Sequence, residues 1–124
     1  MERVTGVGGV FFKSKEPAAL AAWYRDHLGL ELEPGSEAVS VFRWSEPGTT
    51  TWSAFPEDTQ YLGRAESRAM FNYRVKNLDR MLAQLRADAV FVDDRVEISK
   101  FGRFGWAIDP EGNRFELWEP ADGL

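Results

Sequence analysis

The feature that most constrains the fold of this chain is an order of elements that occurs twice within 124 residues. Each half begins with an apolar segment, continues into a helix and ends in three short strands separated by turns. Neither half can bury the apolar face of its sheet alone, so the two must pack together or against another chain. We therefore expect a single α+β domain of two βαβββ modules, at about 4–56 and 69–120, joined by a linker at about 57–68.

The turn and capping residues place the helices and strands of each module. Pro17 suits the first position of a helix and Gly29 its C-terminal cap, which predicts a helix over 17–28. Asn77 is a good N-cap for a second helix that carries Leu78, Met81, Leu82 and Leu85 at helical spacing. Strands are expected at about 7–13, 30–33, 39–44 and 49–55, and again at 69–75, 91–97, 104–108 and 114–119, with a turn over 109–113.

Composition excludes several classes of function. The chain carries 15 basic and 20 acidic residues, a net charge of −5, which argues against binding to nucleic acid. Its apolar runs span only a few residues, so we expect no membrane segment. The absence of cysteine rules out disulfides and thiolate ligands. It also fits a reducing compartment, and residues 1–15 lack the pattern of a signal peptide, so we expect a cytoplasmic protein.

Three segments of the chain resemble one known family. They read AALAAWYRDHLGL over 18–30, VKNLDRMLAQLR over 75–86 and IDPEGNRFELWEP over 108–120. They are similar to the helix entries and closing hairpin of the glyoxalase/bleomycin-resistance/extradiol-dioxygenase superfamily, also called vicinal oxygen chelate proteins. The resemblance implies paired βαβββ modules that form a curved mixed sheet around a cavity, commonly in a homodimer. It does not identify a reaction, because this fold serves both enzymes and binding proteins.

The family's metal-ligand positions are mostly lost in this chain. In metal-using members the ligands come from four strands, and those positions fall here on Gly9, Ser53, Met70 and Glu116. Only Glu116 is a usual ligand, since glycine has no side chain, serine is a poor ligand and a thioether suits Cu(I) best. The single histidine, His27, lies late in the first helix. We therefore expect no cofactor, with a divalent metal as the weaker alternative.

Glu116 is the leading candidate for a functional residue. Strand alternation places Phe115 and Leu117 on one face and Glu116 on the other, together with Arg114 and Trp118. A carboxylate among strand aromatics is costly to bury unpaired. Glu116 could therefore act as a general base or anchor a ligand, or it could form a structural ion pair with Arg74 or Arg114.

The remaining candidates would line a cavity for a small molecule. Asn72 and Arg74 share a strand face with Met70 and could bind a carboxylate or carbonyl group. Aromatic residues on separate strands would suit a flat or apolar ligand, although each could equally belong to the core. The predicted ligand-binding set is Phe11, Trp52, Ser53, Phe55, Met70, Asn72, Arg74, Trp106, Arg114 and Trp118.

Three classes of function are consistent with these residues. The first is a metal-free protein that binds a small molecule and forms a homodimer. The second is a glyoxalase-like lyase or isomerase that uses Glu116 as its base, with or without a divalent metal, and Arg74 or Asn72 to stabilise an oxyanion. The third is an interaction module with a filled cavity and an apolar protein interface.

Overall fold

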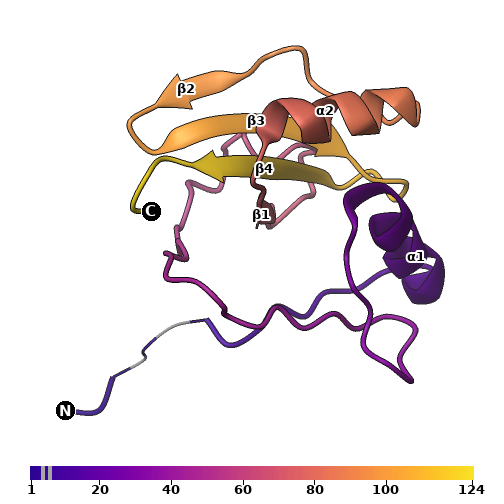
Figure 1. Ribbon diagram of the computed structural model, residues 1–124, viewed down its shortest axis with the longest axis horizontal. Helices are drawn as coiled ribbons and strands as arrows, with labels where there is room; N and C mark the ends of the chain where they lie inside the picture. The colour runs from indigo at the N-terminus through magenta and orange to yellow at the C-terminus, as the bar shows by residue number, and fades with distance from the viewer. Residues whose placement is uncertain (4, 6) are drawn as a thin grey trace.

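A computed structural model describes residues 1–3, 5 and 7–124, so the start of the first module at about residue 4 lies outside the described part. The elements follow in the order α1 (Pro17–Leu28), β1 (Asn72–Arg74), α2 (Leu78–Ala87), β2 (Glu97–Ser99), β3 (Gly102–Ile108) and β4 (Arg114–Pro120). The strands form one curved, unclosed sheet in the order β1-β4-β3-β2 (Figure 1). β1 is parallel to β4, whereas the other neighbours are antiparallel, which confirms the mixed α+β class.

Both helices form where the sequence predicts them, for local reasons. Pro17 occupies the start of α1, and Gly29 ends it in a left-handed conformation (φ 73°), donating its N–H to the carbonyl of Arg25 at 3.2 Å. At the start of α2, the Asn77 side chain accepts the N–H of Arg80 at 3.0 Å. Among the described residues, neither helix combines the length and apolarity that crossing a bilayer requires.

The two helices cover one face of the sheet and bury the core there. Aromatic contacts join Tyr24 of α1 to Phe115 of β4 at 5.7 Å between ring centroids. Gly105 on β3 lets α2 approach closely, since a Cβ at that position would lie 3.1 Å from a methyl carbon of Leu82. The buried cluster comprises Leu20, Tyr24, Leu78, Leu82, Leu85, Val92, Ala107, Phe115 and Leu117.

The second module has the predicted βαβββ order, with its first two strands shorter and its last two slightly longer than expected. The strand predicted over 69–75 is reduced to β1, which lies at the edge of the described sheet and pairs there with β4. The strand predicted over 91–97 begins later than expected and forms only β2. Earlier in the predicted range, a single isolated bridge joins Val92 to Ala107 of β3. The predicted turn over 109–113 is confirmed, because the Asp109 carboxylate accepts the backbone N–H groups of Glu111 and Asn113.

The first module keeps its helix, but the prediction of its strands is wrong for a single chain. Within the described residues, segments 7–13, 39–44 and 49–55 form no strand, and a single bridge pairs Leu32 with Ser40. These segments run as extended chain away from the sheet (Figure 1). An extended segment becomes a strand only when a neighbour accepts and donates its backbone hydrogen bonds. The two-module cavity is therefore absent from the described chain, and the module boundaries remain a prediction.

Candidate functional site

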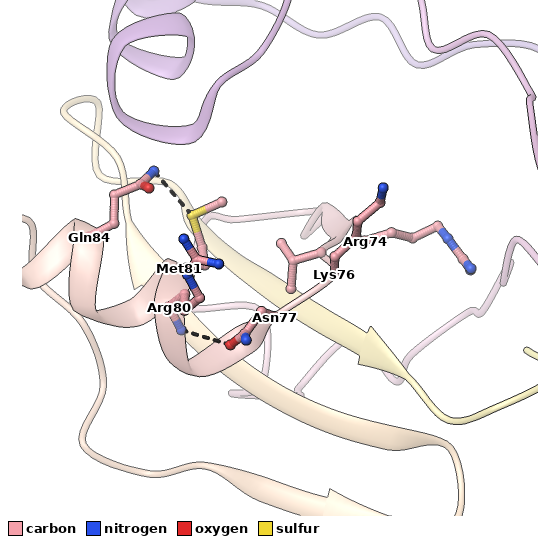
Figure 2. Close-up of a pocket in the computed structure, with 7 residues that line it drawn as sticks. Arg74, Lys76, Asn77, Arg80, Met81 and Gln84 are labelled. Atoms are coloured by element: carbon pink, nitrogen blue, oxygen red, sulfur yellow. Dashed lines mark hydrogen bonds between the residues drawn. The ribbon is translucent and has the colours of Figure 1, made fainter.

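Neither of two grooves in the described part of the chain is lined by Glu116. One, of about 290 Å³, lies at the start of α2 and is lined by Arg74, Val75, Lys76, Asn77, Arg80, Met81 and Gln84. Figure 2 shows its three cationic side chains pointing in different directions, so they do not converge on one anion. The other, of about 530 Å³, is lined by linker residues Glu57, Asp58, Thr59, Gln60, Gly63 and Ala65. The polar groups that do converge lie around Glu116.

The predicted alternation of β4 is confirmed. Phe115 and Leu117 point into the core beneath the helices, whereas Glu116 faces the opposite side of the sheet, where it meets Trp106 of β3. Register places Asn72 of β1 directly opposite Glu116, a pairing that alternation along the chain does not predict. The pairing of the strands thus places Asn72 and Trp106 beside the Glu116 carboxylate.

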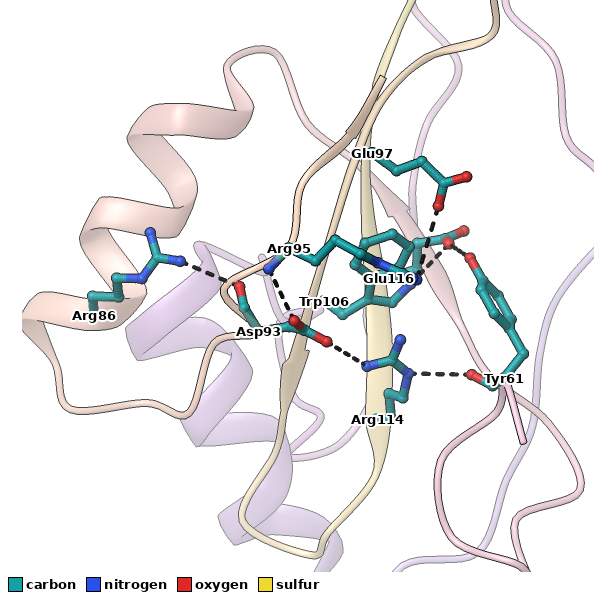
Figure 3. Close-up of polar contacts among 8 residues, drawn as sticks. All are labelled: Tyr61, Arg86, Asp93, Arg95, Glu97, Trp106, Arg114 and Glu116. Carbon is teal, nitrogen blue, oxygen red and sulfur yellow. Dashed lines mark hydrogen bonds and ion pairs between the residues drawn. The ribbon is translucent and has the colours of Figure 1, made fainter. Parts of the chain in front are cut away.

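Three neutral donors hold the Glu116 carboxylate, which is only 8% exposed. Asn72 Nδ2 donates to Oε1 at 2.7 Å and Trp106 Nε1 donates to Oε2 at 3.0 Å. The Tyr61 hydroxyl also donates to Oε2 (Figure 3). These bonds compensate the burial of a charged group without a cation in direct contact.

The alternative of an ion pair between Glu116 and Arg74 or Arg114 is wrong within the described residues. Arg114 pairs with Asp93 at 3.5 Å and donates from Nε to the backbone carbonyl of Tyr61 at 3.1 Å. Arg74 donates to the carbonyl oxygens of Thr49 and Leu124. Each guanidinium is therefore held by acceptors other than Glu116.

Tyr61 is the site residue that sequence reasoning missed. It belongs to the linker, which has no strand or helix periodicity, and its only signal is that it is the sole aromatic residue in a polar stretch. Its ring stacks on Phe55 with centroids 5.5 Å apart and planes 9° from parallel. Burial and the hydrogen bond to Glu116 raise the pKa of the Tyr61 phenol, so the hydroxyl remains a proton donor at neutral pH.

Two arginines lie against Trp106, whose side chain is fully buried. The guanidinium carbons of Arg95 and Arg114 lie 5.0 and 5.2 Å from its ring centroid. Figure 3 shows Arg95 extending toward the Glu116 carboxylate, whereas Arg114 is linked to Asp93 and to the carbonyl of Tyr61. The site therefore combines a buried carboxylate, an indole and two nearby cations.

Two residues along β4 from Glu116, a second aromatic group continues the same face. Arg74 of β1 lies opposite Trp118 of β4, with its guanidinium carbon 5.0 Å from the ring centroid. The Trp118 ring stacks on Phe104 with centroids 6.1 Å apart and planes 8° from parallel. Trp106 and Trp118 thus share one face of the sheet, as a ligand wall would require.

The structure does not bring the other predicted residues to this face. Phe11 is 96% exposed and Trp52 is 80% exposed, while Ser53 lies in the same unpaired segment as Trp52. Their positions depend on strands that do not form in the single chain. Phe55 reaches the site through Tyr61, and Met70 is half-buried ahead of β1. Ligand-binding roles for all these residues remain predictions.

The residues around Glu116 do not fit a divalent metal ion. Across the described residues there is no group of three or more His, Cys, Asp or Glu side chains that could hold one. Both oxygens of Glu116 already accept hydrogen bonds from nitrogen or hydroxyl donors. A cation at this carboxylate would lie among N–H and O–H groups that repel it.

Comparisons with known proteins agree with this fold. The lactoylglutathione lyase from Agrobacterium tumefaciens is 16% identical, with 95% of this chain and 96% of that chain covered and a TM-score of 0.53. A member of the glyoxalase/bleomycin resistance protein/dioxygenase superfamily from Sphaerobacter thermophilus is 17% identical, with 86% and 90% covered and a TM-score of 0.52. A glyoxalase family protein from Enterococcus faecalis aligns over only 52% of each chain, at 21% identity and a TM-score of 0.40.

A search of the curated proteins finds no match. The model of the glyoxalase-like domain family matches residues 9–118, which is most of the chain. The solved structures share the fold at low identity, so they do not carry a reaction over to this protein. The match along the chain, together with the sheet and helices described above, shows that this protein belongs to the glyoxalase-like domain family.

Proposed function

We propose that this protein binds a small, flat, aromatic or amphipathic molecule on the Glu116 face of its sheet, without a metal ion. The observation that carries this proposal is the buried Glu116 carboxylate, which donors from β1, β3 and the linker hold in place. Trp106 lies opposite it on β3, and Trp118 lies two residues further along β4. Aromatic side chains supply contact area, and a fixed acceptor orients a polar group of the ligand.

Binding is favoured over catalysis by the state of the Glu116 oxygens. A general base must bring one free oxygen within hydrogen-bond reach of the proton it removes. Here Asn72, Tyr61 and Trp106 donate to three of the roughly four acceptor sites of the carboxylate, so one site remains for a ligand donor. A proton bound by Glu116, in contrast, would turn an acceptor oxygen into a donor among these three groups. Arg74, the candidate for stabilising an oxyanion, already donates to two backbone carbonyls. The lyase or isomerase that uses Glu116 as its base is therefore the second candidate.

We also propose a homodimer as the working form. The first-module segments leave large apolar side chains in solvent, among them Phe11, Phe42, Trp44 and Trp52. Exposed extended chain and open sheet edges of this kind need a partner. A second copy offers matching segments and a matching sheet. Light scattering after gel filtration should give twice the 14.1 kDa chain mass, whereas a monomer at all concentrations would contradict the proposal.

Tryptophan fluorescence tests the binding proposal directly. The protein is titrated with a panel of flat aromatic and amphipathic metabolites and drugs, alongside Trp106→Phe and a matched control, Trp23→Phe. Trp23 lies on α1, on the helix side of the sheet. A ligand on the Glu116 face should change the emission of wild type and Trp23→Phe but change that of Trp106→Phe much less. Unchanged emission across the panel would overturn the proposal.

Two further measurements separate this proposal from the enzyme. Mass spectrometry of each ligand mixture should show no chemical change, whereas turnover that is lost in Glu116→Gln would favour the lyase or isomerase. After dialysis against Zn(II), Ni(II) or Mn(II), the protein should retain far less than one metal per chain. Stoichiometric metal that disappears in Glu116→Ala would contradict the metal-free proposal.

A further inference from the structure

Tyr61 differs from the other groups that contact Glu116 in where it comes from. Trp106 and Asn72 are parts of the sheet, whereas Tyr61 lies in the linker. The backbone–backbone hydrogen bonds described for the linker are short turns within it, from Thr59 to Pro56, from Gly63 to Gln60 and from Ser67 to Arg64. Tyr61 can therefore leave Glu116 without breaking any hydrogen bond of the sheet ladder, and moving its backbone breaks one bond from β4, from Arg114 Nε to the Tyr61 carbonyl.

The surroundings of the Tyr61 ring form a slot for a phenol. Phe55 stacks on the ring, and Trp106 meets it edge-on at 6.2 Å and 87°. The guanidinium carbon of Arg114 lies 5.9 Å from the ring centroid, which favours an electron-rich ring. The hydroxyl end of the slot is closed by the Glu116 carboxylate. Every surface of this slot would recognise a free phenol in the same way.

We propose that Tyr61 occupies the position of the natural ligand, and that this ligand carries a phenol or an aromatic alcohol that displaces Tyr61 from Glu116. This inference rests on the proposed function and narrows its ligand class. The ring of the ligand lies between Phe55 and Trp106, and its hydroxyl donates to Glu116. The linker moves away with Tyr61, and the groove along residues 57–65 lies on this moving segment.

The experiment empties the slot and refills it with the missing side chain. Tyr61→Ala is titrated with p-cresol, which reproduces the tyrosine side chain, and with toluene, which lacks the hydroxyl, and binding is followed by calorimetry. Tyr61→Phe is the matched control, because it removes the hydroxyl but keeps the slot filled. We expect p-cresol to bind Tyr61→Ala about tenfold or more tightly than toluene, because only p-cresol donates to the buried carboxylate. Tyr61→Phe should bind neither compound measurably better than wild type does.

The inference would be overturned if p-cresol and toluene bound Tyr61→Ala with equal affinity, or if neither bound the folded Tyr61→Ala protein. It would also be overturned if p-cresol bound Tyr61→Phe as tightly as it binds Tyr61→Ala. A second measurement uses the wild-type protein. Saturating p-cresol should increase hydrogen exchange across residues 56–68, and unchanged exchange at saturation would also overturn it. The hydrogen-exchange measurement uses only wild type, so it tests the role of Tyr61 even if Tyr61→Ala does not fold.

The inference and the proposed function can fail separately. If a non-phenolic ligand binds wild type at Trp106 and Tyr61→Ala leaves its affinity unchanged, the proposed function stands and the phenol inference fails. If the wild-type protein binds nothing in the panel but Tyr61→Ala binds p-cresol in preference to toluene, the slot is as described and the proposed function fails.

Discussion

Removing the Glu116 carboxylate should destabilise the fold, because it would leave buried donors without their acceptor. Trp106 is the critical one, since its side chain is fully buried and its N–H donates to Glu116 at 3.0 Å. An unsatisfied buried donor costs about 1–3 kcal/mol. Asn72 and Tyr61 reach solvent and can bond to water instead. We expect Glu116→Ala to lower the free energy of unfolding by about 2 kcal/mol, or the Tm by about 8 °C for a domain of this size.

Urea unfolding followed by circular dichroism measures this difference, with Glu97→Ala as the control. Glu97 is an exposed residue on β2, so its removal should change the free energy of unfolding by less than about 0.5 kcal/mol. A double-mutant cycle isolates the bond itself. Trp106→Phe should lower the free energy of unfolding by about 1–2 kcal/mol less in the Glu116→Ala background than in wild type, because the carboxylate that accepts the Trp106 N–H is already absent.

A stabilised Glu116→Ala protein, or a cycle with no coupling between Glu116 and Trp106, would refute this reasoning. Either result would mean that the three donors do not compensate the burial of the carboxylate. Glu116 would then be an incompletely compensated buried charge that lowers the stability of the fold, as happens at sites kept for function. The enzyme candidate would gain support from that outcome.

Three further predictions concern the scaffold that positions this site. Asn77→Ala removes the N-cap of α2 and should lower the free energy of unfolding by about 1 kcal/mol in urea unfolding. Gly105→Val forces a side chain against Leu82 and should cost about 1–3 kcal/mol by the same assay, and an unchanged midpoint would show that α2 can move away. The Glu111 carboxylate accepts bonds from Ser14 and the N–H groups before α1, so its folded-state pKa lies below the ordinary value of 4.5. Its contribution to stability is present above pH 4.5 and is lost as the pH falls through that lowered pKa. Glu111→Gln should therefore be less stable than wild type at pH 7, and the gap between their urea midpoints should narrow in acid, whereas a constant gap would contradict this role.

The parts of the fold that local chemistry controls could be predicted from the sequence. The ends of α1 follow from Pro17 and Gly29, and the start of α2 from Asn77. The turn over 109–113 follows from the ability of the Asp109 side chain to bind nearby backbone N–H groups. Alternation along β4 was enough to separate Glu116 from Phe115, because the period of a strand depends on the backbone alone.

The parts that depend on distant partners could not be predicted. The strands expected at 7–13, 39–44 and 49–55 have suitable residues, but a strand forms only beside another strand, and a pattern along the chain does not name that neighbour. Tyr61 lies 55 positions before Glu116 in a stretch without periodicity, so nothing local connects them. The same holds for Arg95, which reaches Trp106 only because of how the chain turns into β2.

The sequence alone thus determined the two helices and the order of the second module, because these depend on neighbours a few residues away, whereas the family and the choice of Glu116 followed from the resemblance of its motifs. Only the tertiary structure decided what holds Glu116. Neutral donors from β1, β3 and the linker surround its carboxylate, and not the arginines of the alternative ion pair. Which groups meet at a buried charge is set by the packing of the whole chain, since every donor must reach it at hydrogen-bond distance.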